Sequence, residues 1–192
     1  RSILRLVEPT YGNIIFEGKN ITVLNNKELQ EYRKQAQTIF QDPYSSLNPR
    51  ISIGETIAEP MLVHGIEKDA KKRRERVCEL LEEVGLETAH YQRYPHEFSG
   101  GQRQRICIAR ALAVNPRVVL LDEPLGALDL NLRKDMQFEL KNIQQKLGIT
   151  FIYVTHDQEE ALSMSDTVVV MNGGEIQQIG TPLDIYNEPK NA

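Results

Sequence analysis

The sequence predicts an α/β protein in which a largely parallel sheet carries an inserted helical subdomain. Two observations support this prediction. In the second half of the chain, short apolar runs alternate with segments of helical periodicity, which is typical of parallel strands covered by helices on both faces. Residues 43–98 instead hold prolines, loop residues and an amphipathic stretch at 69–84. We expect a sheet-containing core over residues 1–42 and 110–192, and a helical subdomain over 43–109.

Apolar runs rich in β-branched residues mark the expected strands. They lie at 13–17, 38–40, 117–121, 149–154 and 167–171. The last of these runs precedes Asn172, Gly173 and Gly174, a turn that predicts a hairpin to a further strand at Glu175 and Ile176.

Apolar residues that recur every three or four positions mark the expected helices. They lie at 29–35, 69–84, 102–114, 132–147 and 158–162. Gly85 and Gly148 follow two of these segments and are expected to end them. Residues 42–60 contain several prolines and are expected to be mostly loop. Residues 1–6 resemble a helix already under way without a cap, so we expect the chain to be cut from a longer protein.

The composition excludes several classes of function. The net charge is −4, and the basic run at 71–74 is mixed with glutamates on a helical pattern, so no nucleic-acid partner is expected. Cys78 and Cys107 stand far apart in apolar helical positions, which indicates two reduced, buried thiols. No run approaches eighteen apolar residues and no signal peptide is present, so any membrane role requires a partner.

Three short motifs carry the chemistry. Residues 98–102 read Phe-Ser-Gly-Gly-Gln and open a helix, whose first N–H groups lack partners and attract anions. Residues 121–124 read Leu-Asp-Glu-Pro at a strand end, where two carboxylates could hold a metal and a water. Residues 155–157 read Thr-His-Asp after the next strand. Each motif alone could be a helix cap, a surface turn or a structural histidine, but their order and spacing favour nucleoside triphosphate chemistry.

Over its whole length the chain resembles the ATP-binding-cassette (ABC) ATPases. Residues 98–102 resemble the signature motif, 118–122 the Walker B strand, and Ala127-Leu128-Asp129 the D-loop. Gln41 resembles the Q-loop glutamine and His156 the switch histidine. The resemblance implies a P-loop NTPase-like, RecA-type core with the family's α-helical subdomain inserted, and a dimer that holds two ATP molecules between its subunits.

The resemblance also implies the roles of the site residues, with ATP and Mg²⁺ as the bound groups. Catalysis is expected from Glu123, His156 and Gln41, and metal binding from Asp122 and Gln41. The residues expected to contact the nucleotide are Ser99, Gly100, Gly101, Gln102 and Asp129. Each residue type suits its role, since Glu123 can orient the attacking water and Ser99 can bond a phosphate across the dimer. In the alternative interpretation Gln41 only caps a loop.

One departure from the family concerns the phosphate loop. No G-x-x-x-x-G-K-[ST] motif occurs in the 192 residues, although the resemblance places it just before Arg1. We therefore expect the chain to be truncated at its N-terminus, and expect this polypeptide alone to bind ATP poorly and to hydrolyse none.

The subfamily features divide along the chain. Residues 41–50 and 93–99 resemble ATPases of dipeptide and oligopeptide importers, whereas 125–130, 155–162 and 180–186 resemble those of spermidine/putrescine and sugar importers. Either one lineage combines these features, or the sequence is a hybrid joined near the shared Leu-Asp-Glu-Pro text.

The expected function is the ATP-hydrolysing subunit of an ABC importer, with peptides as the solute and polyamines or sugars as the alternative. Its expected partners are transmembrane permease subunits, a second identical or sibling ATPase and, indirectly, a solute-binding protein. These partners would hold it at the cytoplasmic face of the inner membrane. A soluble ABC protein outside transport and a catalytically inactive binding module are the alternatives of another class. The sequence leaves open the solute and the choice between homodimer and heterodimer.

Overall fold

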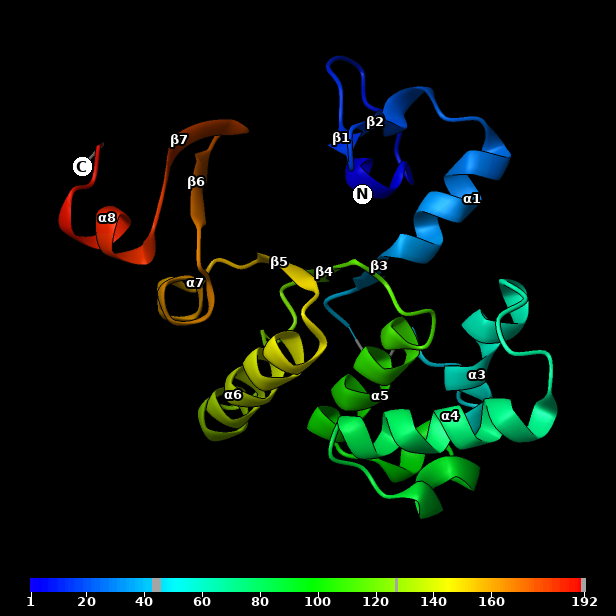
Figure 1. Ribbon diagram of the computed structural model, residues 1–192. Coiled ribbons are helices and arrows are strands. Elements are labelled where there is room, and N and C mark those ends of the chain that lie inside the picture. The colour runs from blue at the N-terminus through cyan, green and yellow to red at the C-terminus, as the bar shows by residue number, and fades with distance from the viewer. Residues whose placement is uncertain (43–45, 127, 191–192) are drawn as a thin grey trace.

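The computed structural model describes residues 1–42, 46–126 and 128–190, and its centre is a three-stranded parallel sheet (Figure 1). Strand β4 (Val118–Asp122) lies between β3 (Ala36–Ile39) and β5 (Thr150–Val154). In the register, Val118 pairs with Ala36 on one side and with Thr150 on the other. The predicted parallel α/β arrangement is therefore confirmed.

Two antiparallel hairpins lie outside this sheet. Near the N-terminus, β1 (Ile15–Phe16) pairs with β2 (Lys19–Asn20), so the strand expected at 13–17 is present but short. Near the C-terminus, β6 (Val168–Asn172) pairs with β7 (Glu175–Gly180) across the expected glycine turn. The hairpin prediction is confirmed, because positive φ angles at both turn glycines match the turn type that suits two-residue connections.

Between β3 and β4, most of the described residues lie in helices. They are α3 (Ile53–Val63), α4 (Ala70–Glu83), η3 (Thr88–Gln92), η4 (Pro95–Glu97) and α5 (Gly100–Leu112). Helix α5 contacts α3, α4 and β3, so it joins the helical part to the sheet. The fully buried side chains at these contacts include Ile53, Ile57, Met61, Leu80, Leu81 and Ile106. The predicted domain boundary at 109/110 falls within α5 and residues 43–45 lie outside the described residues, so the domain division stays a prediction.

The expectation of loop over residues 42–60 is wrong for its last part, because α3 begins at Ile53. Ser52 caps this helix by accepting a hydrogen bond from the Glu55 N–H, and the Glu55 carboxylate accepts one from the Ser52 N–H in return. Pro60 lies inside the helix, which ends three residues later at Val63. A complete capping box and a buried apolar face therefore outweigh the helix-breaking effect of one proline.

The helix expected over residues 1–6 is also wrong. The structure holds only a short 3-10 helix, η1 (Ser2–Leu4), which ends at Arg5 in the left-handed region with φ of 47°. Helix α1 (Asn26–Gln35) fixes this segment in place, because Tyr32 donates a hydrogen bond to the Ile3 carbonyl at 2.8 Å. A second 3-10 helix, η2 (Ile21–Val23), precedes α1.

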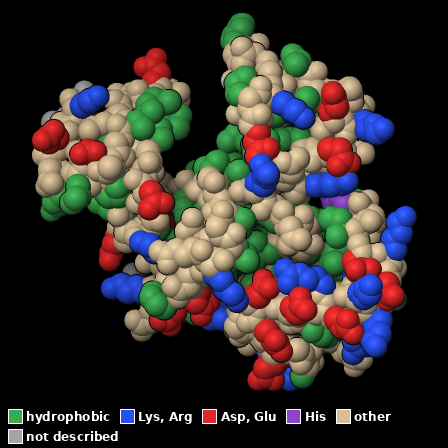
Figure 2. All heavy atoms as spheres, viewed as in Figure 1, with side chains coloured by type: hydrophobic (Ala, Val, Ile, Leu, Met, Phe, Trp, Pro, Cys, Tyr) green, Lys and Arg blue, Asp and Glu red, His purple; other side chains and the backbone are tan. Residues whose placement is uncertain are grey.

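The remaining helices are α6 (Leu130–Leu147), α7 (Gln158–Met164) and α8 (Pro182–Asn187), of which α8 was not predicted. Helices α5 and α6 lie on one side of the sheet (Figure 1). The expectation of cover on both faces holds only in part, since Ile152 and Val154 of β5 are 37% and 53% exposed. Figure 2 shows a hollow between the β6–β7 part and the N-terminal part, with hydrophobic side chains beside it. Within the described ranges, no helix is both long and apolar enough to cross a membrane.

Candidate functional site

The candidate site lies where the three parallel strands end. Gln41 follows β3, Asp122 ends β4 with Glu123 directly after it, and His156 follows β5. The carboxyl ends of parallel strands meet at one edge of the sheet, which is where α/β proteins bind ligands. The topology therefore brings Gln41 and Glu123 together, although they are 82 positions apart in the sequence.

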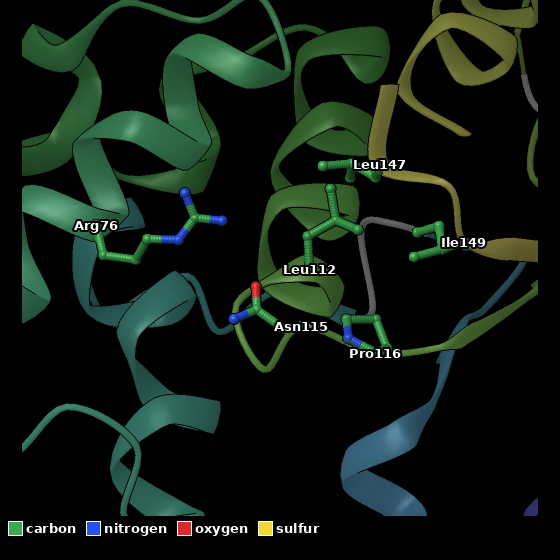
Figure 3. Close-up of a pocket in the computed structure, with 6 residues that line it drawn as sticks. All are labelled: Arg76, Leu112, Asn115, Pro116, Leu147 and Ile149. Carbon is green, nitrogen blue, oxygen red and sulfur yellow. The ribbon is translucent and has the colours of Figure 1, made fainter. Parts of the chain in front are cut away.

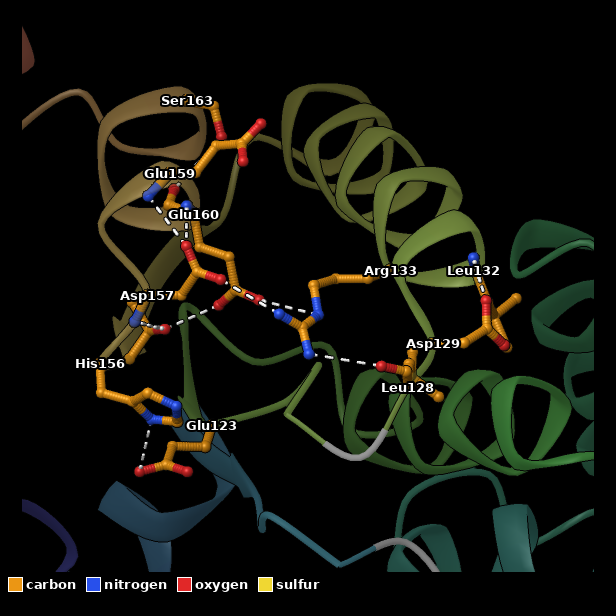
Figure 4. A network of polar contacts seen from close by, with 11 residues as sticks. Glu123, Leu128, Asp129, Leu132, Arg133, His156, Asp157, Glu159, Glu160 and Ser163 are labelled. Carbon is orange, nitrogen blue, oxygen red and sulfur yellow. Dashed lines mark hydrogen bonds and ion pairs between the residues drawn. The ribbon is translucent and has the colours of Figure 1, made fainter.

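The Glu123 carboxylate is held between Gln41 and His156. The Gln41 amide nitrogen donates to one carboxylate oxygen at 2.7 Å, and His156 Nδ1 lies 3.4 Å from the other. Figure 4 shows the His156 imidazole directed at Glu123. The Glu123 side chain is 30% exposed and that of His156 is 76% exposed, so water reaches both. The structure thus brings these three residues together, in an arrangement that can orient a water molecule and accept its proton.

The backbone aims the Glu123 side chain at this position. Glu123 has φ of 45°, in the left-handed region that non-glycine residues rarely adopt. Its N–H donates to the Val154 carbonyl at 2.8 Å, and its carbonyl accepts from the Gly126 N–H at 3.2 Å. An unfavourable conformation fixed by neighbouring hydrogen bonds is typical of functional positions, and here it turns the chain sharply at the end of β4.

A pocket of about 490 Å³ adjoins the same strand ends. It is lined by Arg1, Phe40, Gln41, Asp42, Ser46, Arg110 and Asp122. Asp122 and Gln41 could hold Mg²⁺ here, because that ion takes one or two protein oxygens and completes its shell with water and phosphate. No group of three or more His, Cys, Asp or Glu side chains in the described part of the chain could hold a metal ion by itself. The residues present therefore fit a magnesium ion that is shared with a phosphate ligand.

Sequence reasoning missed Arg110 in this pocket. It lies in the last turn of α5 and donates a hydrogen bond from Nη1 to the Ser46 carbonyl at 2.6 Å. Its charge beside Asp122 and Gln41 suits an anionic ligand. Helical periodicity alone cannot reveal this residue, because the segment around Ser46 lies far from α5 in the sequence.

The predicted nucleotide-contacting residues at the start of α5 form a capped helix end. The Ser99 hydroxyl accepts from the Gln102 N–H at 3.4 Å, and the Gln102 side chain accepts from the Ser99 N–H at 3.0 Å. Ser99 and Gly100 are exposed, whereas Gly101 is buried against Leu132. None of the hydrogen bonds recorded for the described residues joins Ser99 to the Glu123 site. The structure thus places Ser99 and Gly100 of this helix start at the surface.

Asp129 caps the next helix. Its carboxylate accepts a hydrogen bond from the Leu132 N–H at 3.0 Å at the start of α6. Ala127, the first residue of the predicted D-loop, lies outside the described residues, as do Pro43, Tyr44 and Ser45 of the peptide-importer-like segment. Asp129 therefore has a local structural contact, and its expected contact with nucleotide stays a prediction.

A second cavity of about 220 Å³ lies away from the strand ends (Figure 3). It is lined by Arg76, Leu112, Asn115, Pro116, Leu147 and Ile149. It contains none of the predicted site residues, and Arg76 is the charged member of its lining. This cavity therefore adds nothing to the candidate chemistry.

Comparison with known proteins identifies the family of this chain. A family model described as ABC transporter matches residues 1–126. The spermidine/putrescine import ATP-binding protein PotA of Clostridium novyi is 55% identical over 185 residues, which cover 96% of this chain and 50% of that protein. The oligopeptide transport ATP-binding protein OppF of Bacillus subtilis is 44% identical over 190 residues, covering 98% and 62%. The chain thus spans only about half to three fifths of these relatives.

Two solved structures share the fold. The first is cbiO1 from Clostridium perfringens, described as part of the ABC transporter complex cbiONQ. It is 29% identical with a TM-score of 0.87, covering 97% of this chain and 72% of that one. The second is a dimeric ATP-binding cassette in a post-hydrolysis state with ADP and phosphate, at 29% identity and a TM-score of 0.79, covering 94% and 78%. The chain therefore belongs to the ABC transporter family and has the P-loop NTPase-like fold of its ATPase domains.

Proposed function

We propose that the protein binds ATP with Mg²⁺ and hydrolyses it as the ATP-binding subunit of an ABC importer. The observation that carries this proposal is the Glu123 carboxylate held between Gln41 and His156, beside a pocket that Asp122 and Arg110 line. The relatives named as import and transport ATP-binding proteins, and the solved cassette with ADP and phosphate, support the same function.

Each residue has a definite task in this proposal. Glu123 orients the attacking water and accepts its proton, while Gln41 and His156 keep the carboxylate in position. Because the Gln41 amide nitrogen donates to Glu123, its amide oxygen remains for the metal, together with Asp122. Bound Mg²⁺ would neutralise charge on the phosphate oxygens.

The exposed start of α5 fits a role at a second nucleotide. Ser99 and Gly100 are exposed and form a capped helix start, so we propose that Ser99, Gly100, Gly101, Gln102 and Asp129 contact ATP held mainly by a partner ATPase subunit. The dimeric state of one similar structure supports this arrangement. The proposal includes transmembrane permease subunits as partners, a solute-binding protein that acts through them, and a peripheral position at the cytoplasmic face of the inner membrane.

The solute has two candidates, each with its own support. Residues 41–50 and 93–99, which resemble peptide importers, favour peptides. The 55% identity with a spermidine/putrescine import protein favours polyamines. Uptake assays with labelled dipeptide and labelled spermidine, in cells with and without the gene, separate the two candidates. Deleting the gene should lower uptake of the transported solute and leave uptake of the other unchanged.

Replacing Glu123 with Gln tests the hydrolytic role. In the natural gene product that contains residues 1–192, Glu123→Gln should lower the rate of ATP hydrolysis about a hundredfold or more, because an amide cannot accept the proton. Binding of ATP should persist, since size and shape are kept. Glu159→Gln is the matched control, because Glu159 is an exposed carboxylate on α7. Equal hydrolysis by Glu123→Gln and wild type would remove Glu123 from its role.

A further inference from the structure

The Arg133 side chain contacts the backbone of the segment that precedes α6. It lies in the first turn of that helix, where its N–H donates to the Asp129 carbonyl at 2.8 Å. Its guanidinium Nη2 donates to the carbonyl of Leu128 at 3.3 Å. One side of the guanidinium therefore holds the backbone of the Leu128–Asp129 segment.

The other side of the same guanidinium reaches the start of α7. Arg133 Nη1 lies 3.1 Å from Asp157 Oδ2, and Nε lies 3.9 Å from Glu160 Oε1. The second oxygen of Asp157 accepts from the N–H groups of Glu159 and Glu160 at 2.9 and 3.2 Å, which caps the helix. Asp157 directly follows His156, so this contact reaches the histidine that lies beside Glu123 (Figure 4).

The side chains of this cluster are mostly shielded from solvent. The side chains of Arg133, Asp157 and Glu160 are 23%, 28% and 7% exposed. Glu160 also accepts from the Thr155 hydroxyl at 2.7 Å. Burial, together with the charge of Glu160, raises the pKa of the neighbouring Tyr153 well above its usual range. Two carboxylates thus meet in a poorly solvated place, where the guanidinium supplies the opposite charge.

We propose that Arg133 is a positioning residue for the proposed ATP hydrolysis, on which this inference rests. Among the described residues, no hydrogen bond or ion pair joins Arg133 to Glu123, and Arg133 does not line the pocket, so its effect is assigned to Asp157 and the adjoining His156. Its planar fork bonds the Leu128 carbonyl and the Asp157 carboxylate at once, which ties the two segments into one unit. His156 therefore stays beside Glu123 only while the Leu128–Asp129 segment keeps its place.

Steady-state kinetics of the natural gene product test the coupling. Arg133→Met should lower kcat about tenfold and change the KM for ATP less than about twofold, because positioning and not binding is lost. Arg133→Lys should recover part of the rate, since an ammonium keeps the charge but cannot span both partners. Arg76→Met is the matched control, as Arg76 is 29% exposed and pairs with Glu79 and Glu83 on α4. A kcat for Arg133→Met equal to that of Arg76→Met would overturn the proposal.

A double-mutant cycle with Asp157→Asn identifies the path. Asn still caps α7 but loses the ion pair, so Asp157→Asn should reduce kcat in the wild-type background and have little further effect beside Arg133→Met. If the double variant lowers kcat by the product of the two single-variant factors, the residues act independently and the proposal is contradicted.

Nuclear magnetic resonance gives a readout that does not depend on hydrolysis. Asp157→Asn should shift the backbone amide signals of Leu128 and Asp129 when Arg133 is present, and should leave them unchanged beside Arg133→Met. Absence of this coupled shift overturns the link even if hydrolysis is normal. The proposed function is overturned instead if the wild type does not hydrolyse ATP, or if the Glu123→Gln variant is as active as the wild type. In either case the amide shifts still show whether Arg133 links the two segments.

Discussion

The contact between Gly101 and Leu132 leads to a quantitative prediction. A Cβ added at Gly101 would lie 2.9 Å from Leu132 Cδ2, 3.1 Å from Cδ1 and 3.3 Å from Cγ. Such a contact is too short, so Leu132 or the start of α6 must move. A Cβ added at the preceding Gly100 would meet only Leu128 Cδ2, at an ordinary 3.9 Å. The two glycines thus form a matched pair, adjacent in one helix but different in the space beside them.

The expected magnitudes follow from two opposing effects. Alanine stabilises a helix over glycine by about 0.5–1 kcal/mol, so Gly100→Ala should be neutral or slightly stabilising. Overpacking costs about 1–3 kcal/mol, and the lower part of this range applies because Leu132 is only partly buried and can yield. Gly101→Ala should therefore be about 1–2 kcal/mol less stable than Gly100→Ala, and should melt several degrees lower.

Urea unfolding without nucleotide measures this difference. The urea midpoints of both variants are compared, with unchanged slopes showing that the denatured state is the same. Shortening the obstructing side chain with Leu132→Ala should remove most of the Gly101→Ala penalty, because the new methyl group then has room. Equal stability of the two glycine variants, or a penalty that persists beside Leu132→Ala, would refute the reasoning.

Two further predictions concern the helices around the site. Burial raises the pKa of Cys107 to about 11, so at pH 8 its thiol should react with Ellman's reagent only after unfolding, while partly exposed Cys78 reacts in the native protein. Equal labelling of both thiols in the native protein would contradict this burial. An unfolded thiol has a pKa of about 8.5, so the free energy of unfolding should fall as the pH rises from about 8.5 toward 11. Ser52→Ala should cost about 1 kcal/mol in urea unfolding, and Ser52→Asp, which keeps the cap of α3, much less; equal losses would exclude the capping role.

Two local predictions were wrong, the loop over the last part of residues 42–60 and the helix over residues 1–6. The proline at 60 suggested loop, yet the capping box at Ser52 and the buried apolar face of α3 form a helix around it. Residues 1–6 had helical periodicity, yet contacts from α1 hold them in a short 3-10 turn. At residues 1–6, packing against a distant helix overrides a local preference, which periodicity cannot show. At α3 the capping box was itself a local signal, and the prediction gave the proline more weight than the cap.

The candidate site, too, could be predicted only in part from the sequence. The resemblance to the ABC ATPases predicted roles for Glu123, His156 and Gln41 individually, each just after an expected strand. It could not show that the Gln41 amide bonds Glu123 at 2.7 Å, since that contact requires the register of β3 on β4. Arg110 and Arg133 escaped it altogether, because an arginine on a helical pattern is equally consistent with a solvent-exposed face.

By itself, the sequence determined most of the helices and strands, the parallel character of the central sheet and the polar residues at the strand ends, because periodicity, caps and glycine turns act over a few residues. Only the tertiary structure decided which of those side chains meet, how Arg133 joins the Leu128–Asp129 segment to the start of α7, and which face of β5 stays open to solvent. These features depend on how strands pair and helices pack across long sequence separations, and no local pattern encodes the distances involved.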